Sequence, residues 1–217
     1  PGDVLVLAQK IFSKAEDCYV YLNDVNPSPE ATALALEVDK DPRQMELLLR
    51  ESKEVVRKRP GVVIVEHRNG YVHANAGMDK SNIESDEDNP RILLLPENPD
   101  KSAKQMLEGI KARSGVNVPI IINDSAGRAW RNGTAGFALG TAGFDPVENR
   151  IGEPDLFGRE LEVTEVAVAD ELAAAASFIM GQGAEAAPVV LVRGAKLRLS
   201  EAGSQSLIRP KERDLFR

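Results

Sequence analysis

Two short segments of the sequence place oxygen-bearing side chains where a strand is expected to give way to a turn. They are residues 76–82, which read AGMDKSN, and residues 121–128, which read IINDSAGR. Hard divalent cations such as Mg²⁺ bind oxygen ligands, usually one or two carboxylates together with substrate phosphates. Asp79, Asp124 and the hydroxyl of Ser125 are therefore candidate metal ligands, with Asn82 and Arg128 near them in the sequence for a charged substrate. Because Asp, Asn and Gly are also common turn formers, a structural role for either segment is an alternative.

Three further segments carry groups that can contact a phosphate or another anion. Lys14 follows a predicted strand and can bind a phosphate as a point charge, although no Walker loop is present and an ordinary surface role is the alternative. The run Gly181-Gln182-Gly183 can present backbone amides to a phosphate, or can simply end a helix. The segment 128–131, which reads RAWR, can hold an anionic substrate, stack on a ring or anchor a loop on the core.

Other chemically capable residues are interpreted as structural. His67 and His73 lie on a predicted hairpin, and Cys18 is isolated, so zinc lacks the nitrogen and sulfur ligands that it needs. Asp170 and Glu171 begin a predicted helix, where capping and the helix dipole explain acidic residues. We therefore place both carboxylates outside the catalytic site.

The composition limits the class of protein. The chain has 217 residues, 42% of them hydrophobic, and a net charge of −7 with no dominant basic block. This length can form a sizeable core, and the charge argues against nucleic-acid binding through a cationic face. A single cysteine suits a reducing cytosol, and neither a membrane-length apolar run nor a signal peptide is visible, which favours a cytoplasmic protein without membrane contact. Because a strand begins at once, we expect an N-terminal segment to be missing.

Strands and helices alternate along the chain and would position these residues. The apolar and β-branched runs predict strands at 3–8, 61–66, 71–75, 91–95, 116–122, 163–169 and 189–193. Start signals and one-sided apolar patterns predict helices from about 31, from 42, over 102–114 and from 170 to about 180. The second and third strands are expected to form a hairpin across residues 68–70. Such pairing argues against a simple parallel sheet and favours an α+β fold with mixed sheets.

Four segments together resemble one known family in order and spacing. They are residues 4–16 (VLVLAQKIFSKAE), 76–82, 123–131 (NDSAGRAWR) and 163–172 (VTEVAVADEL). Over nearly the whole chain they resemble the coenzyme F-420:L-glutamate ligase family. The resemblance implies one ligase domain over residues 1–217, with mixed and antiparallel sheets in a family-specific fold and an intertwined homodimer. It also implies GTP-dependent γ-glutamyl ligation onto the deazaflavin precursor of the coenzyme.

The resemblance also implies roles for individual residues. Asp79 and Asp124 match metal-binding aspartates at the catalytic centre, and Arg128 can orient the anionic substrate there. Ser125 matches a hydroxyl ligand of a second metal, where Thr is usual, and Gln182 falls where another ligand of that metal lies. The nucleotide contacts implied are Gln9, Lys14, Asn82 and a loop at 180–187 that includes Met180, Gly181, Gln182, Gly183 and Ala184.

The implied chemistry requires two divalent metal ions, Mg²⁺ or Mn²⁺, and GTP as co-substrate, and a monovalent K⁺ is a candidate further ion. The γ-phosphate would convert the precursor's lactyl carboxylate to an acyl phosphate, from which the amine of L-glutamate displaces phosphate. Asn123 and Ala126 depart from the family pattern on either side of Asp124, which concerns substrate positioning more than metal binding. A metal-dependent phosphohydrolase and a non-catalytic dimerising scaffold are the competing interpretations.

Overall fold

The computed structural model describes residues 2–216, and the chain divides into two compact units. Unit 1 comprises residues 1–9, 98–125 and 134–210, and unit 2 comprises residues 10–97, 126–133 and 211–217. Helices and strands occur in both, and the sheets are either mixed or antiparallel. The predicted α+β class with mixed sheets is therefore confirmed.

Unit 1 is built on a mixed four-stranded sheet in the order β11-β1-β7-β8. Its strands are β11 (Val189–Val192), β1 (Val4–Ala8), β7 (Ile120–Arg128) and β8 (Arg131–Ala142). Strand β1 pairs antiparallel with β11 and parallel with β7. The β-branched composition of β1 and β11 suits such half-buried strands.

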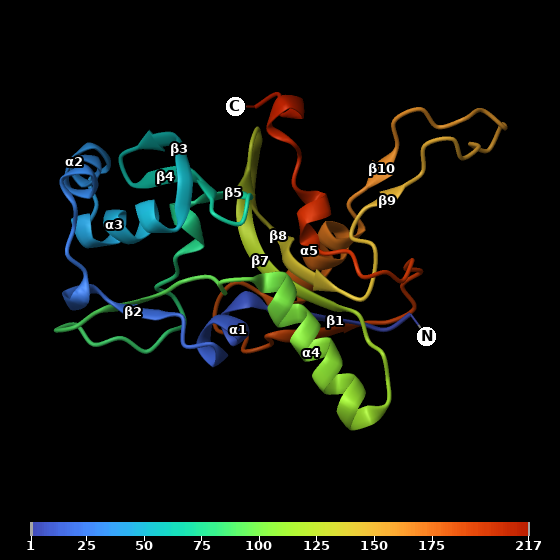
Figure 1. The fold of residues 1–217 in the computed structure, drawn as a ribbon, viewed down its shortest axis with the longest axis horizontal. Coiled ribbons are helices and arrows are strands. Elements are labelled where there is room, and N and C mark those ends of the chain that lie inside the picture. The colour runs from blue at the N-terminus through green and yellow to red at the C-terminus, as the bar shows by residue number, and fades with distance from the viewer. Residues whose placement is uncertain (1, 217) are drawn as a thin grey trace. The chain divides into compact units, whose positions relative to one another are not determined.

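One helix covers each face of this sheet. Helix α5 (Val168–Met180) places three buried alanines, at 169, 173 and 176, against Val4, Val6 and Ile121, and Figure 1 shows it packed on the sheet. Helix α4 (Pro99–Ser114) reaches β8 at Gly140, where an added Cβ atom would lie 2.5 Å from the Pro99 carbonyl carbon. Small side chains thus set how closely both helices approach the sheet.

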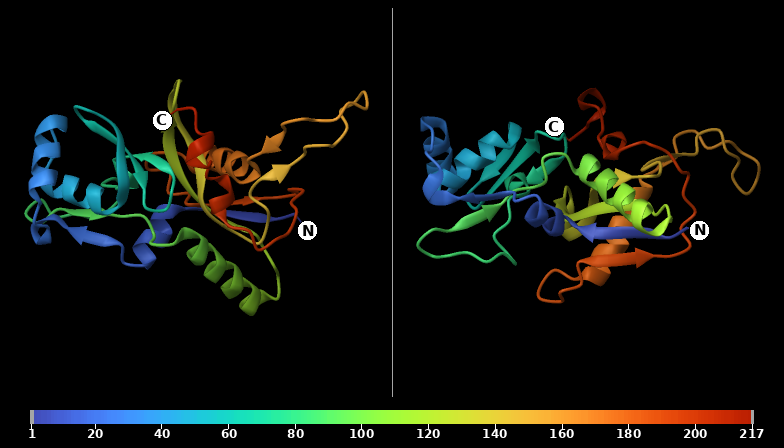
Figure 2. Two further views of the ribbon diagram at one scale, coloured as in Figure 1. Left: turned by 45° about the horizontal axis from the view of Figure 1, so that its top comes forward. Right: turned by 60° about the horizontal axis from the view of Figure 1, so that its bottom comes forward.

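A two-stranded arm extends from unit 1 between β8 and α5. Strands β9 (Glu148–Asn149) and β10 (Glu165–Val166) pair antiparallel at its base, and Figure 2 shows the loop between them projecting from the unit. The predicted strand at 163–169 is therefore wrong over most of its length. Only two of its residues pair, because α5 already begins at Val168, two residues before the predicted start.

Unit 2 packs two helices on an antiparallel three-stranded sheet, β3-β4-β5. Its main elements are α2 (Pro29–Val38), α3 (Pro42–Arg50), β3 (Ser52–Arg59), β4 (Val62–His67) and β5 (Val72–Ala74). The Ser28 hydroxyl and the Asp41 carboxylate accept backbone N–H bonds at the two helix starts, as their sequence positions predict. Pairing of β4 with β5 confirms the predicted hairpin.

Shorter elements complete the two units. They are α1 (Gln9–Ala15), β2 (Tyr19–Tyr21), β6 (Arg91–Leu93) and the 3-10 helices η1 (Leu22–Asp24), η2 (Asn75–Gly77), η3 (Ser204–Leu207) and η4 (Lys211–Arg213). Strand β2 pairs antiparallel with β6. Within residues 2–216, no helix has the length and apolar character needed to cross a membrane.

Candidate functional site

The second acidic segment is not a turn, because β7 continues through it to Arg128. The sequence predicts a strand ending at Asp124, whereas the structure places Asp124 and Ser125 inside a nine-residue strand. Asp124 and the residues after it remain part of β7 because β7 and β8 form a hairpin and are neighbours in the sheet. Two of the metal-ligand candidates, Asp124 and Ser125, are therefore presented from a sheet, which holds side chains more firmly than a loop does.

In unit 1, the side chains of Ser125, Gln182 and Ser177 form a chain of hydrogen bonds, which begins beside Asp124 in the sequence. Asp124 accepts the backbone N–H of Ser125 at 2.8 Å through Oδ1. The Ser125 hydroxyl donates to Gln182 Oε1 at 2.9 Å, and Gln182 Nε2 donates to the Ser177 hydroxyl at 3.1 Å. The fold thus brings together Ser125 and Gln182, which are 57 positions apart in the sequence.

This donor set suits a hard divalent cation. Carboxylate, hydroxyl and amide oxygens are the ligands of Mg²⁺, which binds them octahedrally at about 2.0–2.1 Å, so adjacent ligand oxygens lie roughly 2.9 Å apart. Ser125 Oγ and Gln182 Oε1 lie 2.9 Å apart in the hydrogen bond between them, so the two oxygens could face one ion with little rearrangement. Among residues 2–216, no three His, Cys, Asp or Glu side chains form a metal-binding group by themselves. Any ion here must therefore take hydroxyl, amide or substrate oxygens in addition to the carboxylates.

The glycine-containing loop after α5 binds a carboxylate of its own through a backbone N–H group. Helix α5 ends at Gly181, whose φ of 76° lies in the left-handed region, as predicted for a helix-ending glycine. The next glycine, Gly183, donates its N–H at 2.7 Å to the carboxylate of Glu185. Of the other residues predicted to form this loop, Met180 is buried at the end of α5 and Ala184 is exposed. An N–H group that binds a carboxylate oxygen can also bind a phosphate oxygen.

The first acidic segment, residues 76–82, lies in unit 2. Both oxygen atoms of its Asp79 carboxylate have partners there. Asp79 Oδ1 accepts both the backbone N–H and the hydroxyl of Ser81, at 3.0 and 2.8 Å. Its Oδ2 lies 2.6 Å from the Nζ atom of Lys10. The Asp79 backbone exchanges two hydrogen bonds with Leu93, which fixes the segment beside β6.

Two of the predicted nucleotide contacts also meet in unit 2. Lys14 Nζ donates to the backbone carbonyl of Asn82 at 2.7 Å, and Asn82 itself has a φ of 53°. Gln9, the first residue of α1, is assigned to unit 1 and is buried, with 3% of its surface exposed. Lys10 was not predicted as a site residue. Its position four residues before Lys14 on α1 is the sequence signal, because that spacing places both on one helix face.

The residues interpreted as structural have local partners. His67 is fully buried, stacks on Tyr71 and accepts the Asn69 N–H through Nδ1 at 3.1 Å. His73 is also buried, and its Nδ1 lies 2.8 Å from the Ala74 carbonyl oxygen. Asp170 accepts the N–H of Ala138 at 2.9 Å, and burial raises the pKa of its carboxyl above the ordinary value. Each of these three side chains therefore has at least one contact within its own unit.

Comparison with known proteins places the chain among ligases. The family model described as F420-0:Gamma-glutamyl ligase matches residues 1–194. The protein named Coenzyme F420:L-glutamate ligase from Methanothermobacter thermautotrophicus is 45% identical over 219 residues, which cover 100% of this chain and 85% of that protein. The proteins of the same name from Methanocaldococcus jannaschii and Archaeoglobus fulgidus are 43% and 39% identical, over 100% of this chain and 85% and 84% of theirs.

Proposed function

The chain belongs to the F420-0:gamma-glutamyl ligase family, and we propose that it joins L-glutamate to the deazaflavin precursor of coenzyme F420 at the expense of GTP. The family assignment supports an amide-forming ligase. GTP as the energy source and an acyl phosphate as the intermediate are our proposal.

One structural observation carries the proposal. The oxygen atoms of Ser125 and Gln182 lie 2.9 Å apart in the same unit as Asp124, and Gln182 itself lies between the two glycines of the loop. Metal ligands adjoining a phosphate-binding loop are what phosphoryl transfer from a nucleotide requires. A non-catalytic scaffold has no use for this arrangement.

The reaction proceeds in two displacements. An oxygen of the precursor's lactyl carboxylate attacks the γ-phosphorus of GTP, the bond to the β-phosphate oxygen breaks, and GDP leaves. The amine of L-glutamate then attacks the acyl carbon, loses a proton, and displaces inorganic phosphate. Bound Mg²⁺ or Mn²⁺ supplies charge neutralisation at the phosphates. Asp79, Asp124, Ser125 and Gln182 would hold the two ions.

Cationic side chains assist at the substrates. Lys14 contributes a point charge to the polyphosphate, which matters because the chain carries a net charge of −7 and would otherwise repel it. Gln9, Asn82 and the loop at 180–187 complete the nucleotide contacts. Arg128 orients the anionic acceptor.

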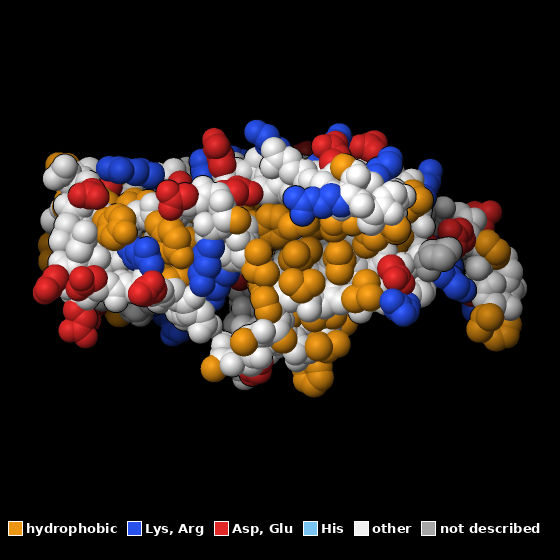
Figure 3. Space-filling model, turned by 90° about the horizontal axis from the view of Figure 1, so that it is seen from below, with side chains coloured by type: hydrophobic (Ala, Val, Ile, Leu, Met, Phe, Trp, Pro, Cys, Tyr) orange, Lys and Arg blue, Asp and Glu red, His pale blue; other side chains and the backbone are white. Residues whose placement is uncertain are grey.

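A second copy of the chain completes the assembly as an intertwined homodimer in our proposal. Apolar side chains are exposed on the arm, among them Leu156 at 99% and Phe157 at 83%, and on β11, where Val189 and Leu191 are about half exposed. Figure 3 shows hydrophobic side chains gathered over one face, and such an area usually marks an interface. Sedimentation equilibrium should therefore give twice the chain mass of 23.5 kDa. A concentration-independent monomer would contradict this.

The decisive assay is GDP release that depends on both organic substrates. With GTP and Mg²⁺ present, release should require L-glutamate and the deazaflavin precursor together, and a chelator should abolish it because the phosphates lose their metal ions. L-Aspartate in place of L-glutamate serves as the control amine. Steady GDP release without glutamate would instead support a phosphohydrolase.

A further inference from the structure

Trp130 has an unusual backbone conformation. Residues 129 and 130 form the two-residue turn between β7 and β8, and the φ of Trp130 is 63°. Glycine or asparagine is the usual residue at such a turn position, whereas a bulky side chain there is strained. Strain of this kind is typical of functional positions, because the surrounding fold must hold it in place.

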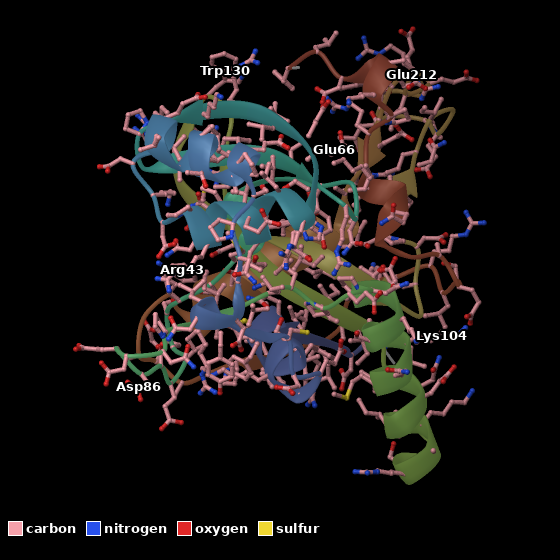
Figure 4. The ribbon with its side chains drawn as sticks, turned by 60° about the vertical axis from the view of Figure 1, so that its left-hand side comes forward. Arg43, Glu66, Asp86, Lys104, Trp130 and Glu212 are labelled. Atoms are coloured by element: carbon pink, nitrogen blue, oxygen red, sulfur yellow. The ribbon has the colours of Figure 1, made fainter. Side chains whose placement is uncertain are left out.

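The side chain of Trp130 makes few packing contacts that could offset this backbone strain. It is 87% exposed, and Figure 4 shows it at the periphery, directed away from the ribbon. Its one described aromatic neighbour is Phe216 of the same unit, whose ring centre lies 6.5 Å away at an angle of 53°. The large indole face is therefore accessible to another planar ring.

Positive charge flanks this aromatic face. Arg128 ends β7 and Arg131 begins β8, and both side chains are exposed. Within residues 2–216, neither guanidinium is paired with a carboxylate. The hairpin tip therefore combines an open aromatic face with two cations that are available to an anionic group.

We propose that this tip binds the acceptor substrate, with the indole of Trp130 stacked on the planar deazaflavin ring and Arg128 and Arg131 at an anionic group of the same molecule. The inference rests on the proposed function and names the part of the enzyme that recognises the acceptor. An anionic molecule with a planar ring complements this surface in both shape and charge.

The acceptor suits the tip better than the guanine ring of GTP does. The proposed nucleotide contacts are Gln9, Lys14, Asn82 and the loop at 180–187, and none of them belongs to the hairpin tip. Trp130 and Arg131 instead continue the segment that carries Asp124 and Ser125.

Fluorescence of the intact protein tests the inference without turnover. Trp130 is the only tryptophan in the chain, so its emission reports on this position alone. The deazaflavin precursor should quench the emission in a saturable manner, with no requirement for glutamate, whereas GTP with Mg²⁺ should leave it unchanged. Quenching by GTP alone would overturn the inference in favour of the nucleotide. A protein-concentration-dependent change without ligand would overturn it in favour of a second chain.

Substitutions give a second, independent measurement. Trp130→Ala should weaken precursor binding, followed by the anisotropy of the precursor's own fluorescence, by about 10- to 100-fold, the range of stacking on an aromatic side chain. Trp130→Phe should lose less, and GTP affinity should stay constant in both variants. Leu36→Ala, which truncates an 84% exposed side chain on α2 of the same unit, is the matched control.

The two proposals fail in different ways. Unchanged precursor affinity in Trp130→Ala, with ligase activity intact, would overturn the role of the tip while leaving the proposed function standing. Saturable quenching without any ligase activity would support the tip and refute the proposed reaction. Thermal unfolding of each variant should match that of the parent, because Trp130 buries little surface.

Discussion

Replacing Asp124 with Asn should abolish glutamate ligation while leaving the fold intact. The substitution removes one negative charge from the donor set proposed to hold the metal ions. Metal stabilisation of a transferring phosphoryl group is worth several kcal/mol, and each 1.4 kcal/mol is about tenfold in rate. We therefore expect GDP release to fall at least about a thousandfold.

The fold should tolerate this change because the geometry of the side chain is kept. Asp124 Oδ1 accepts the Ser125 N–H at 2.8 Å, and the amide oxygen of Asn can accept the same bond. The midpoint of thermal unfolding should therefore stay within a few degrees of the parent. Calorimetric titration with Mn²⁺ in the presence of GTP should show weaker metal binding.

Asp145→Asn is the matched control in the same unit. Its carboxylate pairs with Arg198 at 3.2 Å on the surface, and such a pair contributes about 0–1 kcal/mol. This variant should keep full activity and metal affinity. If Asp124→Asn retained activity, or if both variants lost it equally, the assignment of Asp124 as a metal ligand would be wrong.

The parts of the fold that the sequence predicts well are those set by local chemistry. Ser28 and Asp41 stand directly before helices and accept their first free N–H groups, so both starts are visible from a few residues. Gly181 ends α5 for a similarly local reason, its left-handed φ. The hairpin of β4 and β5 follows from a turn flanked by β-branched residues.

Elements that depend on distant partners are harder to predict. Strand β3 reads SKEVVRKR, is largely exposed, and lacks an apolar run, so only its pairing with β4 makes it a strand. Strand β7 continues beyond Asp124 for the same reason, because β8 is its neighbour. Local polarity suggests a turn after residue 122 and gives no strand signal at 52–59, and strand pairing overrides it in both segments.

The candidate site also combines features that are visible locally in the sequence with contacts that depend on distant residues. The acidic segments and the glycine loop are visible as separate motifs, but nothing local brings Ser125 to Gln182. Lys10 lies 2.6 Å from Asp79, yet in the sequence it is one of several polar residues after a strand. Resemblance over four segments, rather than local chemistry, is what predicts that the acidic segments and the glycine loop belong to one site.

Oxygen-18 placed in the lactyl carboxylate of the precursor should appear in the released phosphate. The carboxylate oxygen that attacks GTP becomes the bridging oxygen of the acyl phosphate, and it leaves with phosphorus when glutamate attacks carbon. With both carboxylate oxygens labelled, one label should reach phosphate per turnover and the other should stay in the amide. Mass spectrometry of both products measures the partition.

We expect the enzyme itself never to be modified during this reaction, because neither Cys18 nor His67 is set up for nucleophilic catalysis. Burial, followed by the carboxylates of Glu16 and Glu51, raises the pKa of the Cys18 thiol, which disfavours the reactive thiolate at neutral pH. His67 is fully buried, and its Nδ1 accepts a backbone N–H, so it is not free to activate a hydroxyl. Cys18→Ala should therefore keep near-parental activity. A phosphorylated protein trapped with labelled GTP, or label retained wholly in the amide product, would show that the acyl phosphate does not form on the substrate.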